Sequence, residues 1–206
     1  MEIKHETRHI VAIMDLLGAT KLISGCESED VMNFISDMYE KTATDWVNVE
    51  HAPEELKQIK CVTFSDNIAL GLELPLDLSD KELNDKIDAF VLYICILQCC
   101  SLKNPRLLFR GGIAIGDLYM DSDKNFVWGK ALLEAHILEE KVAIYPRVVL
   151  SRMIDTTRLI TKEVITKDFD GEYFVDYFKK TKSKNPEWIQ KTKDLIETVY
   201  TNEEDE

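Results

Sequence analysis

The sequence has little of what marks several large classes of protein. It contains only 8 glycines and 5 prolines among 206 residues, and 45% of its residues are hydrophobic. This composition excludes collagen-like and disordered chains and is typical of a globular protein. Basic residues are also in deficit, because 25 Lys and Arg stand against 38 Asp and Glu, a formal net charge of −13. We therefore expect neither nucleic acid nor an anionic membrane surface as a partner.

Long apolar runs and a secretory leader are missing as well. The longest apolar run, AFVLYICILQCC at 89–100, has roughly twelve residues, whereas a membrane span needs about 20. The first ten residues, MEIKHETRHI, contain no apolar stretch behind a basic start, so we expect no signal peptide. The five cysteines are an odd number and the four histidines show no ligand spacing, so we expect neither a disulfide framework nor a zinc site. These features predict a cytoplasmic protein.

The order of the predicted elements indicates an α+β fold. No repeat or low-complexity linker divides the chain, so we expect a single domain over 1–206, with its core at about 8–178 and an acidic tail at 201–206. Strands are predicted at 9–16, 58–72 (a hairpin turning at 65–67), 106–120, 142–151 and 171–178. Helices are predicted at 31–46, 79–102, 130–141 and 184–200. This order predicts helices covering a mostly antiparallel sheet.

Two serines are candidate helix caps. Ser79 precedes the helix at 79–102, and Glu82 follows it by three residues, which predicts a capping box. Ser151 ends the strand at 142–151 and is a plausible N-cap for a further helix.

Two aspartates lie in apolar surroundings at the ends of predicted strands. Asp15 ends a buried strand, and Asp66 occupies the tip of the hairpin. If the first strand and the hairpin lie side by side, these carboxylates repel each other unless a cation lies between them. Mg²⁺ favours one or two carboxylates together with phosphate oxygens. The alternative is structural, with Asp15 as a helix cap and Asp66 as a turn former.

The segment after Asp15 strengthens the case for a phosphate ligand. Leu16, Leu17, Gly18, Ala19 and Thr20 run from a strand into a helix start, where exposed backbone N–H groups and the helix dipole suit a triphosphate.

Four blocks of this sequence resemble the catalytic domains of class III nucleotidyl cyclases. DLLGAT at 15–20 resembles their D-I-x-G-F-T opening, and Ser65-Asp66 stands where they have a G-D hairpin. RGGIAIG at 110–116 resembles their R-x-G-I-x-x-G strand. Gly129 and the helix after it resemble their G-x-x-V-N-x-A-x-R-L helix. The blocks occur in the family's order over residues 10–150, and the resemblance implies a ferredoxin-like βαββαβ core.

The resemblance also assigns roles to residues. It implies that Asp15 and Asp66 bind two divalent ions, Mg²⁺ or Mn²⁺, with the Leu16 carbonyl as a further metal ligand. Arg110 matches the family arginine that contacts the triphosphate. Independently of the family, a charge within LLFRGGIAIG needs a partner. A structural salt bridge from Arg110 to Asp15 or Asp66 is the alternative interpretation.

The departures from the family pattern concern base recognition and the transition state. The family's Asn and Arg on the last block fall on Leu133 and Ile137, and its purine-selecting residues fall on Phe126 and Val62. Lys60 lies two residues before Val62 and is a candidate for binding the base edge. The usual adenine and guanine readers are therefore absent.

The sequence resembles the pyrimidine cyclases of bacterial Pycsar anti-phage systems. It shares with them these departures, the size of a single stand-alone domain, the S-D hairpin and the strand at 110–116. This resemblance implies a homodimer with sites at the interface. It implies conversion of UTP, favoured over CTP, to the 3′,5′-cyclic nucleotide and pyrophosphate. The product then activates a separate effector.

Other candidates for the base site remain open. Trp46, Tyr39 or Phe126 could stack on a pyrimidine and Asn67 could bind its edge, although core packing also explains the aromatics. Two alternative functions also remain: a catalytically inactive cyclase fold that binds a nucleotide or a partner, and a purine cyclase with relocated base-reading residues.

Overall fold

The computed structural model describes residues 5–19, 29, 33, 54–64, 66–102 and 108–203. Its strands are β1 (Thr7–Leu16), β2 (Lys60–Phe64), β3 (Asn67–Glu73), β4 (Phe109–Asp121), β5 (Phe126–Trp128), β6 (Val148–Leu150), β7 (Ile165–Lys167) and β8 (Tyr173–Val175). Its α-helices are α3 (Asp80–Ser101), α4 (Lys130–Lys141), α5 (Tyr177–Lys184) and α6 (Pro186–Glu203). Three short 3₁₀ segments are η1 (Glu54–Gln58), η2 (Thr156–Arg158) and η3 (Ile160–Val164).

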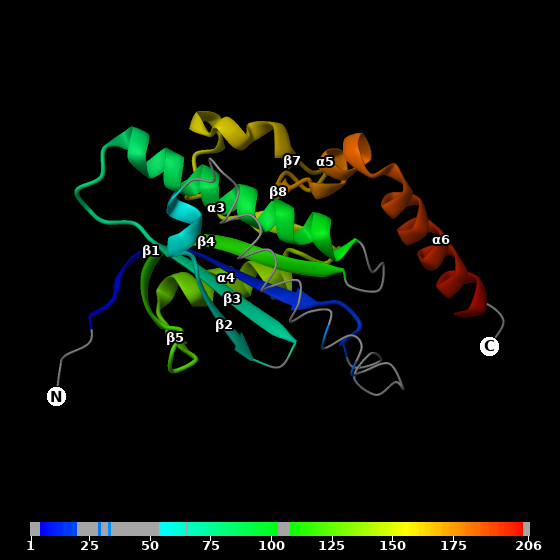
Figure 1. The fold of residues 1–206 in the computed structure, drawn as a ribbon, viewed down its shortest axis with the longest axis horizontal. Coiled ribbons are helices and arrows are strands. Elements are labelled where there is room, and N and C mark those ends of the chain that lie inside the picture. The colour runs from blue at the N-terminus through cyan, green and yellow to red at the C-terminus, as the bar shows by residue number, and fades with distance from the viewer. Residues whose placement is uncertain are drawn as a thin grey trace.

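The strands form one sheet in the order β2-β3-β1-β4-β6-β8-β7, with β5 paired to β4 (Figure 1). Every pairing is antiparallel except that of β4 with β6. The order β4-β1-β3-β2 is that of a ferredoxin-like core, so the predicted α+β class and mostly antiparallel sheet are confirmed. Ala19, Glu29 and Asn33 are helical, and the rest of the helix predicted at 31–46 lies outside the described residues.

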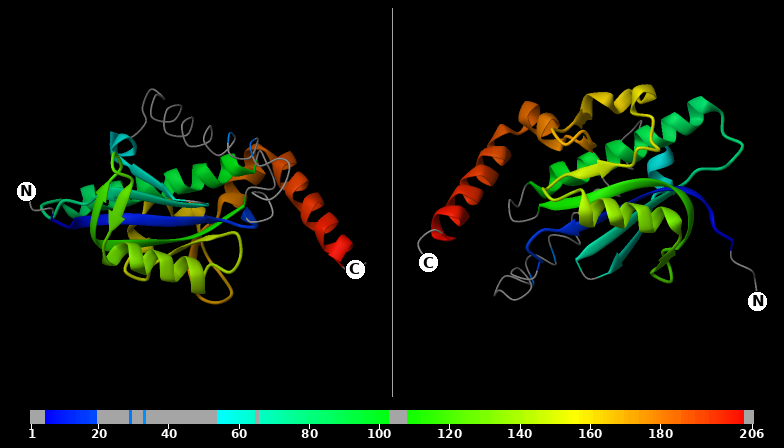
Figure 2. Two further views of the ribbon diagram at one scale, coloured as in Figure 1. Left: turned by 90° about the horizontal axis from the view of Figure 1, so that it is seen from below. Right: turned by 180° about the vertical axis from the view of Figure 1, so that it is seen from behind.

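Strand β1 is central because its two faces feed two separate cores. Ile10, Ala12 and Met14 belong to the core that contains α3, whereas Val11 and Ile13 belong to the core that contains α4. Successive side chains of a strand point to opposite faces, which explains the nearly continuous apolar run in the sequence. The views in Figure 2 accordingly show α3 and α4 on opposite sides of the sheet.

The predicted capping box begins α3. The Ser79 side chain accepts a hydrogen bond from the Glu82 backbone N–H at 3.3 Å, and the Glu82 carboxylate accepts one from the Ser79 N–H at 2.9 Å. Two of the N–H groups that a helix start leaves without intrahelical partners are thereby satisfied.

Helix α4 packs directly on β4 through a glycine. A Cβ on Gly112 would lie 2.3 Å from the Ala135 carbonyl oxygen and 2.5 Å from the Leu138 Cβ. Only a residue without a side chain therefore permits this approach of helix to strand. The same close approach sets the distance from α4 to Arg110, two residues earlier on β4.

Beyond α4 the sequence predictions were partly wrong. The predicted strand 142–151 is reduced to β6, and Ser151 begins no α-helix, because its Oγ accepts from the Met153 N–H in a tight turn. The predicted strand 171–178 is reduced to β8, because the Asp176 carboxylate accepts from the Lys179 N–H at 3.0 Å and so caps α5.

Helix α6 begins two residues later than the predicted helix 184–200 and continues through residues 201–203 of the predicted tail. It extends away from the sheet in Figures 1 and 2.

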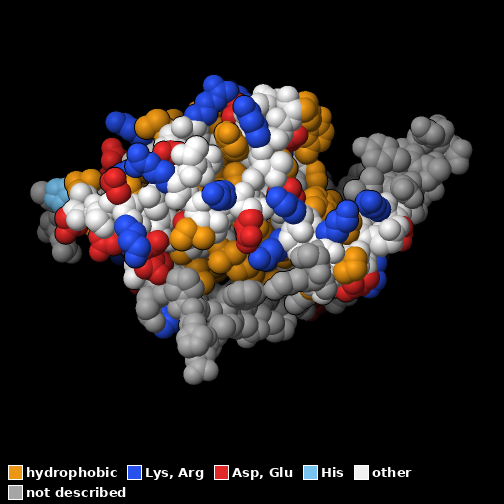
Figure 3. Space-filling view, turned by 90° about the horizontal axis from the view of Figure 1, so that it is seen from above, with side chains coloured by type: hydrophobic (Ala, Val, Ile, Leu, Met, Phe, Trp, Pro, Cys, Tyr) orange, Lys and Arg blue, Asp and Glu red, His pale blue; other side chains and the backbone are white. Residues whose placement is uncertain are grey.

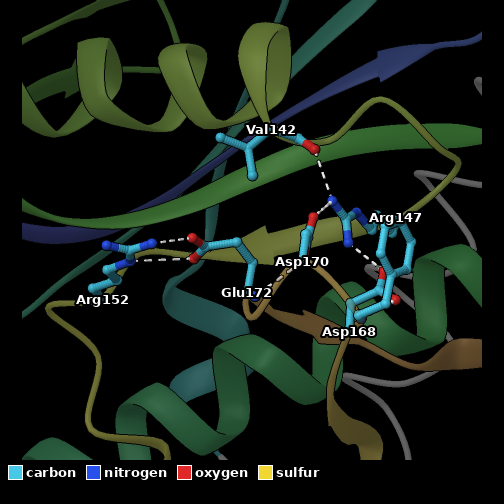
Figure 4. Close-up of polar contacts among 7 residues, drawn as sticks. Val142, Arg147, Arg152, Asp168, Asp170 and Glu172 are labelled. Atoms are coloured by element: carbon cyan, nitrogen blue, oxygen red, sulfur yellow. Dashed lines mark hydrogen bonds and ion pairs between the residues drawn. The ribbon is translucent and has the colours of Figure 1, made fainter.

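The β7–β8 hairpin is fastened to the chain after α4 by a buried arginine. Arg147 is 4% exposed and forms ion pairs with Asp168 and Asp170, and its Nη2 donates to the Val142 carbonyl at 2.8 Å (Figure 4). Burial alone would lower the pKa of Arg147, but the two carboxylates outweigh it and the pKa is raised. These contacts assign Arg147 a structural role within the fold.

The surface seen in Figure 3 carries basic and acidic side chains interspersed with apolar ones. No helix in the described part of the chain is long and apolar enough to cross a membrane. Four of the five cysteines fall within the described ranges, and no disulfide joins any two of them: Cys61, Cys95, Cys99 and Cys100.

Candidate functional site

The pairing of three strands brings the predicted site residues to one end of the sheet. Asp15 lies opposite Arg110 where β1 pairs with β4, and opposite Asn67 where β1 pairs with β3. Asp66 directly precedes Asn67, and its carbonyl oxygen accepts the Leu16 N–H at 3.3 Å. The strands thus gather Asp15, Asp66 and Arg110, residues that are up to 95 positions apart in the sequence.

Arg110 is held between two carboxylates. Its Nε donates to the Asp15 Oδ2 at 3.1 Å, and its Nη2 lies 2.9 Å from the Glu139 Oε1. The side chains of Asp15 and Arg110 are 17% and 28% exposed, so both remain accessible to a ligand. The salt bridge expected as the alternative role of Arg110 is therefore present. It does not exclude a phosphate contact, because a guanidinium has five N–H donors.

Glu139 is the residue of this site that the sequence did not reveal. A solvated or interfacial position is natural for a Glu on an amphipathic helix, yet Glu139 is 3% exposed. Burial raises the pKa of its carboxyl and Arg110 opposes that effect. A signal was available, because Ala131, Ala135 and Glu139 repeat every four residues on the buried face of α4.

Glu139 also contacts a histidine. Its Oε2 lies 3.2 Å from the Nδ1 of His136, whose side chain is 52% exposed. One buried carboxylate therefore binds two cationic or potentially cationic groups, Arg110 through one oxygen and His136 through the other. His136 therefore lies on the exposed surface of α4 and is not packed in the core.

The backbone after Asp15 is partly committed to the fold. The Leu17 N–H donates to the Leu108 carbonyl at 2.9 Å, and the Leu16 N–H donates to Asp66. Gly18 has φ +75°, and Ala19 is helical. Among the described residues of the predicted phosphate loop, Gly18 and Ala19 are therefore the candidates for N–H donation. Thr20 and Ser65 lie outside the described residues.

Lys60 is not brought beside Asp15. It pairs with Gly71, which pairs with Val11, four residues along β1 from Asp15. Four residues of strand span about 13 Å. Val62, at the family position of the purine-selecting lysine, is 1% exposed and belongs to the core under α4. Phe126 is 48% exposed and packs at 6.0 Å from the Tyr119 ring.

A pocket of about 610 Å³ reaches this cluster through Asn67, which pairs with Asp15, and through His136, but Asp15, Asp66 and Arg110 do not line it. Its wall has apolar side chains, among them Phe64, Trp128 and Leu133, and two charged ones, Glu6 and Lys130. Phe64 and Trp128 are 42% and 66% exposed, and nothing in their local sequence singles them out. Trp46 and Tyr39, the other aromatics considered for stacking, lie outside the described residues.

The donor set of this site fits a hard divalent cation. Asp15, Asp66 and the Leu16 carbonyl would offer oxygen ligands only, as Mg²⁺ and Mn²⁺ prefer. Within the described ranges no group of three or more His, Cys, Asp or Glu side chains is arranged to hold a metal by itself. Mg²⁺ commonly takes one or two carboxylates from a protein, and phosphate oxygens of the substrate complete its coordination sphere.

Comparison with known proteins gives a structural match only. No protein-family model matches the sequence, and no curated protein matches it.

Solved structures do match the fold. The monomeric guanylyl cyclase domain of the RhoGC fusion protein from the aquatic fungus Blastocladiella emersonii has a TM-score of 0.57 at 16% identity, covering 85% of this chain and 98% of that one. The guanylate cyclase domain of RhGC from Catenaria anguillulae, in complex with GTP, gives 0.54 at 16% identity, covering 84% and 98%. A bacterial light-regulated adenylyl cyclase gives 0.53 at 14% identity, covering 92% and 100%. The chain therefore has the fold of class III nucleotidyl cyclase domains.

Proposed function

We propose that this protein is a nucleotidyl cyclase that converts a pyrimidine nucleoside triphosphate, UTP in preference to CTP, to the 3′,5′-cyclic nucleotide and pyrophosphate. The observation that carries the proposal is the cluster of Asp15, Asp66 and Arg110 at the end of the central strands of a class III cyclase fold. A purely structural module would have no need of a half-exposed arginine beside a strand-end carboxylate at this position.

In the proposed reaction the ribose 3′-oxygen attacks the α-phosphorus. A new P–O bond forms, the bond to the β-phosphate oxygen breaks with its electron pair, and pyrophosphate leaves while the hydroxyl proton passes to solvent. Divalent ions held by Asp15, Asp66 and the Leu16 carbonyl would lower the pKa of the attacking hydroxyl and neutralise phosphate charge. Arg110 keeps N–H groups beyond those directed at Asp15 and Glu139, and these would bind the leaving phosphates.

Pyrimidine specificity is supported by the lack of polar side chains at Val62 and Phe126, the two positions where class III cyclases carry purine-selecting residues. Val62 is buried and apolar, and Phe126 has no group that forms a directional hydrogen bond with a base. Asn67, in contrast, lines the pocket and carries both a donor and an acceptor for a base edge. Lys60 could bind the base only if the ligand extends about 13 Å along the strands from Asp15. The exposed aromatics Phe64 and Trp128 offer surfaces for stacking.

A homodimer is part of this proposal. Trp128, Leu133 and Ile137 are 66%, 59% and 42% exposed on the side of the sheet that carries α4, beside the pocket. An apolar surface of this kind is typical of an interface. We further propose that the product is a messenger in anti-phage defence and activates a separate effector, a role supported only by the sequence resemblance to the pyrimidine cyclases.

The second candidate is a purine cyclase. It is favoured by the matched structures, one of which is described in complex with GTP and another, a rhodopsin-guanylyl cyclase with converted specificity, with ATPαS.

One experiment separates the candidates. The protein is incubated with each of the four ribonucleoside triphosphates and Mn²⁺, and the products are identified by mass spectrometry. Cyclic UMP or cyclic CMP supports the proposal, cyclic AMP or cyclic GMP alone selects the purine cyclase, and four intact substrates support a binding module.

Asp66→Ala is expected to lower the rate at least 100-fold, because the substitution removes a metal ligand. Asp123→Ala, in the exposed turn between β4 and β5, is the control and should keep full activity. A fully active Asp66→Ala variant would refute the metal role.

Metal dependence of binding gives an independent test. With a net charge of −13, the protein should bind UTP weakly when EDTA removes divalent ions. Equally tight binding with and without metal, measured by calorimetry, would count against the proposed site.

A further inference from the structure

His136 occupies a place where the sequence resemblance expects other chemistry. The two α4 positions at which class III cyclases carry polar residues are Leu133 and Ile137, and both side chains are apolar and exposed. His136 lies between them in the sequence and lines the pocket beside Asn67. Besides Lys130 in its first turn, helix α4 therefore offers the pocket one polar side chain, His136, which lies one residue away from the expected position.

A buried carboxylate holds this histidine. The Glu139 side chain is 4% exposed, and its two oxygens reach two different elements, Arg110 on β4 at 2.9 Å and His136 on α4 at 3.2 Å. The imidazole contact uses Nδ1, so Nε2 is the ring nitrogen left for a ligand in the pocket. A carboxylate on one ring nitrogen fixes the orientation of the other.

The charged groups around the cluster limit which ligand it can take. Asp15 and Glu139 face the single cation Arg110, and the pocket wall adds Lys130 and Glu6. An anionic ligand at His136 would have two cationic partners in the pocket: Lys130 and, with protons on both ring nitrogens, His136 itself.

We propose, on the basis of the cyclase function proposed above, that His136 is a substrate-binding residue that donates from Nε2 to a phosphate oxygen of the bound nucleotide. Glu139 is the positioning residue that holds His136 and Arg110 at a common spacing. The pair replaces, from within one chain, the polar groups that Leu133 and Ile137 do not supply. The apolar remainder of the pocket, including Trp128, is left for the base.

The test measures binding of inorganic pyrophosphate with Mg²⁺ by calorimetry, alongside kcat and KM for the nucleotide turned over. His136→Gln should weaken pyrophosphate binding about tenfold, as expected for one charge-assisted hydrogen bond. His136→Lys, which keeps a cation, should regain most of that loss. Glu140→Gln on the exposed side of the same helix is the matched control and should match the wild type in both measurements.

A double-variant cycle tests the positioning role. Glu139→Gln should weaken pyrophosphate binding in the wild-type background and weaken it less in the His136→Gln background, because part of its effect passes through His136. A merely structural Glu139 would lower the melting temperature without this coupling. KM should rise more than kcat falls for His136→Gln, since a phosphate contact made in both ground and transition states is uniform binding.

The outcomes separate this inference from the proposed function. If the wild type forms a cyclic nucleotide while His136→Gln matches it in pyrophosphate binding and KM, the inference fails alone. If no triphosphate is cyclised but His136→Gln still loses pyrophosphate binding, the proposed reaction fails and the histidine contact stands. His136→Lys binding pyrophosphate more weakly than His136→Gln would overturn the phosphate contact. If the glutamine variant does not fold, His136→Lys is compared with the wild type, and a loss of binding of about tenfold or more would overturn it.

Discussion

Gly112→Ala is the substitution with the sharpest structural consequence for this site. The new Cβ would lie 2.3 Å from the Ala135 carbonyl oxygen, whereas ordinary contacts begin at 3.4 Å, so α4 must retreat by 3.4 − 2.3 = 1.1 Å. Overpacking of this kind costs about 1–3 kcal/mol. The lower unfolded-state entropy of Ala offsets about 0.4–1 kcal/mol of that cost.

The same retreat acts on the site, because Glu139 follows the clashing Leu138 on α4. If the movement falls along the ion pair, the distance from Arg110 Nη2 to Glu139 Oε1 grows from 2.9 Å to 2.9 + 1.1 = 4.0 Å. The attraction between the two charges weakens as their separation grows. We therefore expect Gly112→Ala to lose both stability and activity.

Thermal unfolding followed by circular dichroism measures the first effect. At mid-range the two effects leave a net cost of about 1.3 kcal/mol. A change of 1 kcal/mol shifts the melting temperature of a chain of this size by about 2–4 °C, so a decrease of about 3–5 °C is expected. Gly116→Ala on the same strand is the control, because its Cβ would meet Ala131 at an ordinary 3.5 Å. Equal melting temperatures for the two variants would refute the close packing of α4 on β4.

The remaining predictions concern stability. Asp88 is 8% exposed and accepts hydrogen bonds from the Ile160 N–H at 2.9 Å and the Thr161 N–H at 2.8 Å, so Asp88→Ala should lower the free energy of unfolding in urea by about 2–3 kcal/mol. The control Asp85→Ala removes only an exposed ion pair to Lys81 at 3.7 Å and should lower it by less than about 1 kcal/mol. Similar losses in the two variants would contradict the importance of these two hydrogen bonds. His9 is 3% exposed, and burial lowers the pKa of its imidazole despite the opposing hydrogen bond to the Thr7 carbonyl. The unfolded chain then binds the proton more readily, so the contribution of His9 to stability should be full above pH 6.5 and fall as the pH drops toward the lowered pKa. His9→Gln should make the free energy of unfolding less dependent on pH between 7.5 and 5. An unchanged pH dependence would assign it to other groups.

On α4 this cyclase-like fold has Leu133 and Ile137 where the sequence resemblance expects Asn and Arg. The site nevertheless keeps charged groups, because Arg110, Glu139 and His136 contact one another. Leu133 and Ile137 widen the apolar surface of α4, which favours association, while His136 keeps one polar group at the pocket. The contacts of Glu139 with Arg110 and His136 are the feature through which the proposed active site can be tested apart from the fold.

Local patterns predicted elements well where one physical effect dominated. The bounds of α4 agree with the predicted 130–141, because Gly129 precedes an uninterrupted run of helix-forming residues. The start of α3 agrees because Ser79 and Glu82 satisfy each other. After α4 the patterns failed, since the strands there have three residues each. Their place in the sheet depends on pairing with β4 and with one another, and Arg147 ties the β7–β8 turn to the chain after α4.

What the sequence determined by itself is the class of fold, and it also supplied three candidate site residues. Asp15, Asp66 and Arg110 stand out because a charged residue in an apolar strand or at its end requires a partner, and the alternation of apolar residues on β1 requires two covered faces. Only the tertiary structure decided which partners these residues have. Glu139 became part of the site because Gly112 lets α4 lie close against β4, and that distance depends on contacts between segments far apart in the chain.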